Sequence, residues 1–479
     1  MRGAQLADLL SATPAGTTDA LDVLDGFDRA LVGGLGRLDQ ERASALADLA
    51  GAVAGTPLGA AVGEAVDKIV AGSVGEEQLL LLAGARTAIA GAVHDALVDQ
   101  LDTALGRTRS EWPALPPAAD GPAVGGPTGD GPAVDGRLLA ARSWLAELAI
   151  TGWRNVDHDL VSASQQALQA LLTEPTLRRA AVLLDGLATE LHACSPVAML
   201  DRLPRRRWAD LWARGMLLTR RDDVTPDTER ISGRLLLLGA DVHEHATAVQ
   251  VQVHGLLEAA GEAVPRLVRA SVSAAKVDTI VGPVVWQLLS GHQTLLAALA
   301  GRLSLELTEM PLRPSGDLLW RDAQARVGEP ADPFATARVQ LAGVLAPAAP
   351  PLDRHPVTIA EPVLVEGYPT AAGDGVGGLV FDVDGSPLPV ATDRLPGCGP
   401  LTVELAARSS ACVGLLRWDA GRWSLQPLGV QATVKRKTVD VHTGDWAQGP
   451  TDPKVAKALT RSGDPIGVLR ERAGRLLRK

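Results

Sequence analysis

Histidine provides the first candidates for chemistry in this chain, because two histidines have a spacing that a strand could use. His243 and His245 lie two residues apart in the stretch DVHEH, which places both imidazoles on one face of a strand. Two imidazoles could bind a metal, but H-E-x-x-H is absent and no third ligand is spaced nearby. His158 lies between two aspartates at a predicted helix start, where acids offset the helix dipole. We therefore expect no catalytic residue, no metal and no cofactor.

Two glycine-containing stretches resemble ligand-binding loops only in part. GDGVGG (373–378) has the glycines of a phosphate-binding loop, but such a loop precedes a helix, and a strand is predicted here. DVDG (382–385) begins like a calcium loop and lacks the later ligands and the closing glutamate. Both stretches are predicted to be turns.

The densest stretch of the chain is DRLPRRRWADLWARGMLLTRR, residues 201–221. At 100° per residue, Trp208 and Trp212 fall on one apolar face of a helix, which predicts that both indoles pack in a core. Gly215 on the same face would let another helix approach closely. The tryptophans of this stretch are therefore expected to be structural.

The arginines of the same stretch are harder to explain. Arg205, Arg206 and Arg207 fall in the first helical turn, where cations oppose the helix dipole by roughly 0.3–1 kcal/mol each. Either acids from another segment pair with them, or they face a partner; we favour pairing within the chain. If a partner does bind here, Arg205, Arg206, Arg207 and Arg214 are the candidate contact residues.

The elements that would position these residues change type along the chain. Apolar residues recur at helical spacing in the first half and alternate with polar residues later, and two Pro-rich stretches separate the blocks. This predicts an α+β multidomain fold with a helical N-terminal half, a mixed α+β middle module and a small antiparallel β domain near the C-terminus. The predicted units are a helical domain (1–110), a disordered Pro/Gly linker (113–135), a helical bundle (136–225), a mixed α+β module (229–345), a small antiparallel β domain (357–442) and a basic tail helix (450–479).

The middle module begins with strands that have one polar face each. In HATAVQVQVHGLLE, three valines alternate with Gln250, Gln252 and His254. In PRLVRASVSAAKV, apolar residues alternate with Arg269, Ser271 and Ser273 in the same way. GEAVP between them is predicted to be a hairpin loop, GRLLLLGADVHE a preceding strand, and GPVVWQLLSGHQTLLAALAG a following helix.

Composition limits the class of protein further. The chain has 479 residues, a net charge of −10 and three cysteines, too few for a disulfide scaffold. A protein that coats nucleic acid would more often be basic overall. The N-terminal stretch lacks a long apolar run, and the most apolar segment, residues 79–93, contains Arg86 and is too short for a bilayer span. We expect a cytoplasmic protein without a membrane partner.

Several stretches between about 195 and 440 carry a family resemblance: LDRLPRRRWADLWARGMLLT, HGLLE with RLVRASVSAAKVD, GDLLWRDA with ADPFATARV, and LVFDVDGSPLPV with GLLRWDAGRWSLQPLGV. These are similar to uncharacterised actinobacterial accessory proteins of gene clusters that encode SWIM zinc-finger proteins, MoxR-type AAA ATPases and von Willebrand A domain proteins. The resemblance implies association with an ATPase–von Willebrand A system, in maturation or defence. A SWIM finger needs C-x-C followed by C-x-H, which Cys194, Cys398 and Cys412 cannot supply, so zinc is not implied.

Three functional hypotheses follow. The first is a non-enzymatic cytoplasmic interaction or scaffold protein whose partner is a protein, such as the AAA ATPase or the von Willebrand A domain protein. The alternative is a nucleic-acid-associated protein that uses the arginines of 201–221, the basic triplet 435–437 and the basic tail. The third is an unrecognised enzyme built on His158, His243 or His245.

Overall fold

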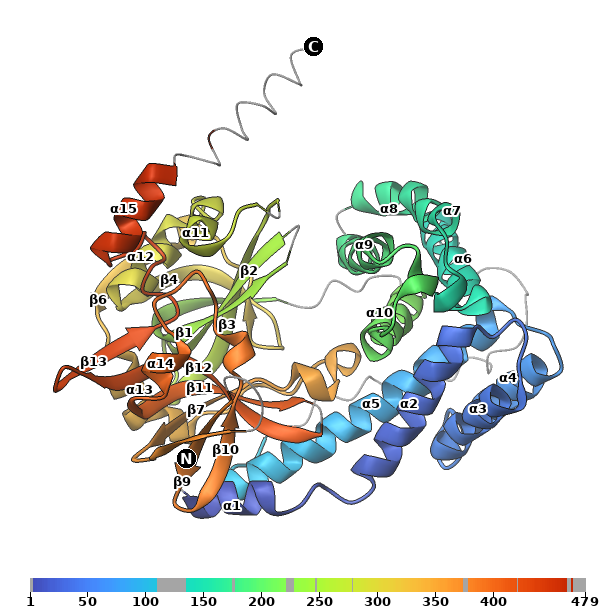
Figure 1. The fold of residues 1–479 in the computed structure, drawn as a ribbon, viewed down its shortest axis with the longest axis horizontal. Helices are drawn as coiled ribbons and strands as arrows, with labels where there is room; N and C mark the ends of the chain where they lie inside the picture. The colour runs from blue at the N-terminus through green and yellow to red at the C-terminus, as the bar shows by residue number, and fades with distance from the viewer. Residues whose placement is uncertain are drawn as a thin grey trace, which may run out of the picture.

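The computed structural model describes residues 3–109, 135–174, 177–220, 228–245, 248–277, 279–373, 378–419, 421–462 and 467. The fold is α+β, with helices in the N-terminal half and two sheets later in the chain, as predicted. Figure 1 shows helices α2 to α10 on one side of the molecule and both sheets on the other. The predicted linker (113–135) lies almost entirely outside the described residues.

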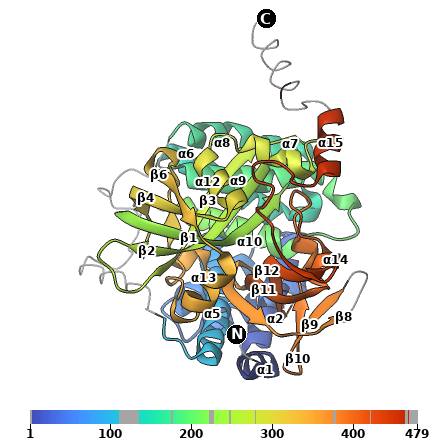
Figure 2. The ribbon, with the colours of Figure 1, turned by 90° about the vertical axis from the view of Figure 1, so that its left-hand side faces the viewer.

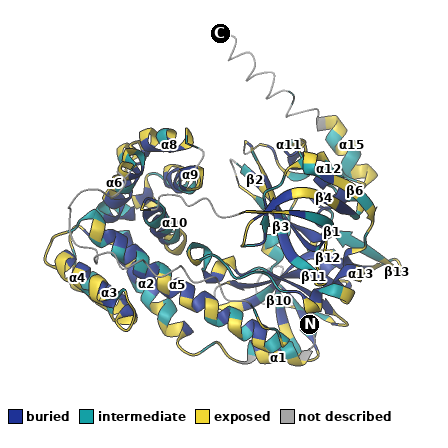
Figure 3. Cartoon of the chain, turned by 180° about the vertical axis from the view of Figure 1, so that it is seen from behind, coloured by how far each residue is buried: buried dark blue, intermediate teal, exposed yellow. Residues whose placement is uncertain are grey.

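The helical half consists of ten helices among the described residues. They are α1 (Gly3–Ser11), α2 (Thr17–Gly33), α3 (Gln40–Val53), α4 (Gly59–Val70), α5 (Glu76–Leu105), α6 (Gly136–Thr151), α7 (His158–Ser162), α8 (Ser164–Leu172), α9 (Arg178–Ala193) and α10 (Arg205–Leu218). Aspartates start several of them: Asp39 accepts a hydrogen bond from the backbone N of Arg42, and Asp157 from that of Leu160. Figure 3 shows that α3 and α4 expose their outer faces while their inner faces are buried.

The two helical blocks predicted from the sequence share one hydrophobic core. Phe27 of α2 packs against Trp212 of α10, with ring centroids 6.2 Å apart, and Trp208 packs edge-on against Trp153. Both α10 tryptophans are fully buried, as their helical face predicts. A Cβ on Gly215 would lie 3.0 Å from Leu184 of α9, which explains the glycine at this close approach.

Helix α5 joins the two halves of the molecule. Its first part belongs to the helical core, whereas Val93, Leu97 and Leu101 pack with the second sheet. Among the described helices, α5 is the one that is long and apolar enough to cross a membrane, and 61% of its most apolar window is buried. Such burial is typical of a core helix in a globular fold.

The first sheet contains β1 (Glu229–Glu244), β2 (Ala248–Ala259), β3 (Arg266–Ala275), β4 (Leu303–Leu312), β5 (Asp317–Leu318) and β6 (Ala325–Pro330). Its strands run in the order β1-β2-β3-β5-β4-β6, and β1 also pairs with β4, so five of the strands close into a ring. The helix predicted from GPVVWQLLSGHQTLLAALAG is divided into α11 (Val285–Leu288) and α12 (Gln293–Gly301). Ser290 and Gly291, which are poor helix formers, lie at the break.

Strands β1 to β3 turn one apolar face toward the core of the ring, and their outer face is polar at the cleft and apolar where it packs against α13 and the second sheet. Val251 and Val253 of β2 pack in the core, and Val268 and Val272 of β3 face the same way. A bulge in β1 changes its alternation after Leu237, and Gly239 follows it. Gly239 has φ 153°, and a Cβ there would lie 2.7 Å from Leu428, so the bulge lets the second sheet pack closely on β1.

The second sheet consists of β7 (Glu361–Glu366), β8 (Thr370–Ala372), β9 (Leu379–Val383), β10 (Ser386–Val390), β11 (Ser409–Asp419), β12 (Arg422–Val434) and β13 (Lys437–His442). The hairpins predicted at Asp384-Gly385 and at residues 419–421 join β9 to β10 and β11 to β12. The sheet is not wholly antiparallel, because β10 and β12 pair in parallel at Val390 and Leu425. A long connection, residues 391–408, returns the chain before β11 and makes this parallel pairing possible.

Neither sheet packs by itself. The core of the second sheet includes Leu6 and Leu9 of α1 as well as the end of α5. Helix α13 (Pro333–Gln340) inserts Phe334 among residues of both sheets, and Figure 2 shows α13 beside them. The short α14 (Val403–Ala406) follows β10 in the chain. Of the predicted tail helix (450–479), the structure describes residues 450–462, which include α15 (Pro453–Ser462), and residue 467.

Candidate binding cleft

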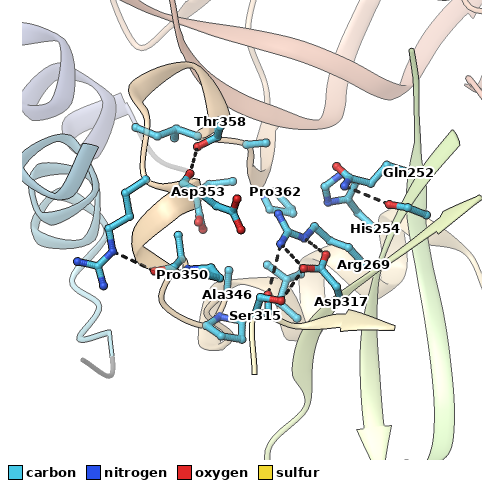
Figure 4. Close-up of a pocket in the computed structure, with 18 of the residues that line it drawn as sticks. Gln252, His254, Arg269, Ser315, Asp317, Ala346, Pro350, Asp353, Thr358 and Pro362 are labelled. Atoms are coloured by element: carbon cyan, nitrogen blue, oxygen red, sulfur yellow. Dashed lines mark hydrogen bonds and ion pairs between the residues drawn. The ribbon is translucent and has the colours of Figure 1, made fainter. Parts of the chain in front are cut away.

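A cleft of about 1420 Å³ separates the helical half from the first sheet. One side is formed by the polar faces of β2 and β3, the end of β1 and residues that follow β4 and β5, together with Arg394 and Arg417 of the second-sheet region. The other side is formed by α5 and by the crossing segment, residues 346–362, which contains the second Pro-rich stretch. Figure 4 shows His254 and Arg269 on the strand side, facing Asp353 and Pro362 of the crossing segment.

Strand register brings the predicted polar faces together. His254 of β2 lies directly opposite Arg269 of β3, and Gln252 lies opposite Ser271, to which its amide donates a hydrogen bond of 3.3 Å. Because β1 pairs with β2 on its other side, Asp241 becomes the neighbour of Gln252. Alternating polar residues on three strands therefore form one continuous polar surface.

Asp241 is the most strongly held group on this surface. It is buried, and its carboxylate accepts hydrogen bonds from Arg417 of β11 at 2.5 Å and from Gln426 of β12 at 2.7 Å. His243 Nε2 lies 2.8 Å from the same carboxylate. Burial alone would raise the pKa of Asp241, but the His243 hydrogen bond and the Arg417 charge hold it well below its usual range.

His254 is buried on the cleft wall and lacks a partner at one ring nitrogen. The residue is 1% exposed, and its Nε2 makes no hydrogen bond to any described residue. Burial, and next the charge of Arg269, lowers the pKa of His254 to about 3. The ring is therefore neutral near pH 7, with one ring N–H and one acceptor nitrogen.

The side chain of Arg269 is held by two residues that follow β4 in the chain, Ser315 and Asp317. Its Nε and Nη2 contact the Asp317 carboxylate at 3.0 and 3.1 Å, and Nη2 donates to the carbonyl of Ser315 at 3.3 Å. The hydroxyl of Ser315 in turn donates to Asp317 at 2.6 Å. Parallel pairing of β3 with β5 brings these groups together (Figure 4).

The two sides of the cleft carry different charge. The strand side, which we call the basic wall, contributes one lining carboxylate, Asp317, and eight basic or imidazole side chains. These are Arg269, Arg313, Arg321, Arg394, Arg417, His243, His245 and His254. Within the described part of the chain, Arg313 and Arg321 are exposed and make no ion pair.

The opposite side carries carboxylates that are mostly neutralised in place. Arg109 pairs with both Asp102 and Glu361, at 2.8 and 3.1 Å. Asp95 of α5 pairs with Arg354 of the crossing segment at 2.8 Å. Asp99 of α5 is exposed there and makes no ion pair with a described residue, so one negative charge on this side faces the unpaired Arg313 and Arg321 of the basic wall.

Three of the four predicted contact arginines of α10 are paired within the chain. Arg205 contacts Asp25 at 2.9 Å, Arg207 contacts Glu190 and Arg214 contacts Asp210, the last two at 2.5 Å. Arg206 has an exposed side chain, and its carbonyl accepts a hydrogen bond from Arg86. Of these four arginines, Arg207 lines the cleft. Their role in partner binding stays a prediction.

The predicted histidines lie in two places. His158 lies in the helical half, where its ring centroid is 5.5 Å from that of His192. His243 and His245 line the cleft. Asp241 and His243 resemble the orienting acid and the base of a catalytic triad, but no described hydroxyl or thiol hydrogen bonds His243. No group of three or more His, Cys, Asp or Glu residues in the described chain could hold a metal.

The described basic segments do not lie on one surface. Helix α10 is in the helical half, and the triplet 435–437 forms the turn between β12 and β13 on the far side of the sheets (Figure 1). No family model, curated protein or solved structure matches this chain.

Sequence reasoning missed the charged residues that complete the cleft. Asp241 and Arg417 each lie within an apolar run, LLLLGADV and GLLRWD, where a charge has to find a partner to be buried. A single charge within an apolar run therefore indicates a buried ion pair. The partner could not be identified, because the two residues are 176 positions apart.

Proposed function

We propose that this chain is a non-enzymatic interaction protein whose cleft binds an acidic segment of a partner protein. The observation that carries the proposal is the basic wall, where arginines and histidines from separate parts of the chain line one side of the cleft and Asp317 is the one carboxylate that lines the same side. Interfaces place complementary charge in this way to steer encounter and select the partner.

The size of the cleft favours a polypeptide over a small ligand. Sites for small molecules usually measure about 300–1,000 Å³, and this cleft measures about 1420 Å³. An extended segment rises about 3.3 Å per residue, so several successive side chains could contact the wall. The segment would lie along Gln250, Gln252 and His254, with its carboxylates toward the arginines.

The family resemblance suggests the identity of the partner. It implies a MoxR-type ATPase or a von Willebrand A domain protein, and we include that association in the proposal. An acidic surface segment on such a protein is the feature that the cleft would recognise. The nucleic-acid alternative gains no support from the separate positions of α10 and of the triplet 435–437.

Binding of a defined acidic peptide tests the proposal. The probe is a capped, fluorescently labelled peptide of about twelve residues that alternates Glu and Ser, long enough to span the wall. Fluorescence anisotropy should detect saturable binding that weakens with salt, and a Gln/Ser peptide should not bind. Absence of binding at low salt would refute the proposal.

A matched pair of variants locates the binding site. Arg313→Gln with Arg321→Gln removes two exposed, unpaired charges from the basic wall, and the affinity should fall roughly three- to tenfold. Arg326→Gln with Arg422→Gln removes two exposed charges that do not line the cleft and should leave the affinity within about twofold. Equal losses in both double variants would place binding elsewhere. A purified candidate ATPase or von Willebrand A protein should respond to the two variants in the same way.

A further inference from the structure

The unpartnered nitrogen of His254 is the least expected feature of the cleft. Buried polar side-chain atoms nearly always have a hydrogen-bond partner, because leaving one unpaired costs its full desolvation penalty. His254 is 1% exposed, yet its Nε2 has no partner among the described residues. Its side chain lines the cleft, so a bound group could supply the missing partner (Figure 4).

The neighbours of His254 indicate the charge of that group. Arg269 is its cross-strand partner, and the cations of Arg269 and Arg417 both oppose protonation of the ring. Asp241, the buried carboxylate nearby, already accepts from Arg417, Gln426 and His243. The empty hydrogen-bonding position therefore lies in a cationic environment, which favours an anion.

Arg269 has a free nitrogen to share with such an anion. Asp317 and Ser315 use its Nε and Nη2, and Nη1 makes no hydrogen bond to a described residue. The side chain remains about one-third exposed, at 34%. Arginine binds carboxylates and other oxyanions through adjacent N–H groups.

We propose that His254 Nε2 and Arg269 Nη1, both on the basic wall, together bind one carboxylate of the incoming acidic segment. This inference rests on the proposed function and names the group that anchors the segment. One carboxylate oxygen accepts from the neutral imidazole N–H and the other from the guanidinium. A carboxylate suits the position better than a phosphate dianion, because Arg417 is already committed to Asp241 and Gln426.

Substitutions at His254 test the anchor with the Glu/Ser peptide. His254→Leu removes the N–H, and the affinity should fall roughly tenfold, the typical value of one hydrogen bond to a charged group. His254→Gln restores a donor and should recover part of the loss. His192→Leu, which removes an exposed imidazole that does not line the cleft, is the matched control and should change affinity less than about twofold.

Nuclear magnetic resonance of ¹⁵N-histidine-labelled full-length protein gives a second measurement. The His254 ring signal, assigned by its loss in His254→Gln, should shift when the peptide or sodium acetate is added, and should not shift in Arg269→Gln. The titration midpoint of His254 should also rise in the complex, because a bound anion favours the protonated ring. A purely structural role for His254 predicts neither change.

The outcomes separate this inference from the proposed function. If the peptide binds and the arginine double variant weakens it while His254→Leu does not, the anchor is wrong and the proposed function stands. If acetate shifts the His254 signal while no peptide binds, His254 and Arg269 bind a carboxylate and the proposed function fails. Inorganic phosphate that shifts the signal at lower concentration than acetate would overturn the choice of a carboxylate.

Discussion

Two buried arginine–aspartate pairs, one in each half of the molecule, use the same chemistry in different surroundings. In the helical core, Arg86 donates to Asp28 through Nε at 2.7 Å and Nη2 at 3.0 Å, and both side chains are at most 1% exposed. At the cleft, Arg417 donates to Asp241 at 2.5 Å, and Gln426 and His243 contact the same carboxylate.

The difference lies in how each carboxylate is supported. Burial raises the pKa of Asp28 despite the charge of Arg86, whereas Asp241 has extra donors that keep its pKa well below the usual range. The Arg86 pair is sealed inside the helical core, but Arg417 and His243 both line the cleft. One pair holds helices together, and the other keeps a fixed charge pattern at the edge of a binding surface.

Breaking the sealed pair should have the largest effect. Asp28→Ala removes both hydrogen bonds of the buried Arg86 to Asp28 and leaves only the more distant Asp210, at 3.8 Å, so it should lower the free energy of unfolding by about 3–5 kcal/mol. Urea denaturation monitored by circular dichroism would measure this loss. The double variant Asp28→Leu with Arg86→Leu removes both charges and should recover most of the stability. A loss below about 1 kcal/mol in Asp28→Ala would show that Arg86 reaches solvent or another acid.

The fold was more predictable than the cleft, because local patterns determine elements. The Trp208 and Trp212 face, the polar alternation of β2 and β3, and the Asp384-Gly385 hairpin all follow from spacing within a few residues. What failed were statements about how elements combine. The sequence separated two helical blocks that share a core, and it gave no sign that α5 would also pack on the second sheet.

The cleft could be predicted only in part, for the same reason. The polar faces with Gln252 and Ser271 were expected, since period-two alternation is a local property. What these faces bind could not be predicted, because the opposite side of the cleft comes from residues 94–109, far before these strands, and residues 346–362, far after them. The arginine-rich start of α10 is more conspicuous in the sequence than the cleft residues. Its arginines nevertheless pair with acids of α2 and α9, which the sequence could not identify.

Breaking the open pair should have a smaller effect on stability and a distinct effect on binding. Asp241→Asn should lower the free energy of unfolding by about 2–3 kcal/mol, because Arg417 keeps Gln426 and borders the cleft. Loss of this negative charge should also tighten binding of the Glu/Ser peptide, while Asp28→Asn should not. If Asp241→Asn weakened binding, the carboxylate would be positioning a group that contacts the peptide directly.

Acid should destabilise the cleft through His254. Its pKa is about 3 in the folded chain and about 6.5 when unfolded, so the unfolded chain binds the proton first as the pH falls. The free energy of unfolding therefore begins to fall below pH 6.5, and His254 accounts for a loss of about 2 kcal/mol at pH 5. His355 and His442, each with a pKa lowered to about 4 chiefly by burial, add to the same window.

Comparison with His254→Gln isolates the cleft histidine from the other two. Between pH 7 and pH 5, the wild-type free energy of unfolding should fall more steeply than that of His254→Gln, by about 2 kcal/mol. The lowered pKa of Asp241 makes its contribution fall away only at more acidic pH, below about 4, so it does not obscure this window. Parallel pH profiles for the two proteins would mean that His254 is protonated in the folded state.

The smallest effect is expected where arginine is most abundant, at the start of α10. Changing Arg205, Arg206 and Arg207 together to Gln removes the contacts with Asp25 and Glu190. Arg205 and Arg207 are roughly half exposed, at 44% and 55%, and such exposed pairs contribute about 0.2–1 kcal/mol each. Removing three first-turn cations offsets part of that loss, because they oppose the helix dipole. We therefore expect a net loss of about 1 kcal/mol or less in urea denaturation.

The same triple variant decides between the two interpretations of α10. If these arginines act only within the chain, binding of the Glu/Ser peptide should change less than about threefold, since only Arg207 lines the cleft. If they are a partner contact instead, stability should rise as the dipole conflict is relieved, and binding of the partner should be lost. The two interpretations give opposite signs for the free energy of unfolding. The pairing of Arg205 and Arg207 with acids favours the loss, so a measured gain would move the contact surface from the cleft to α10.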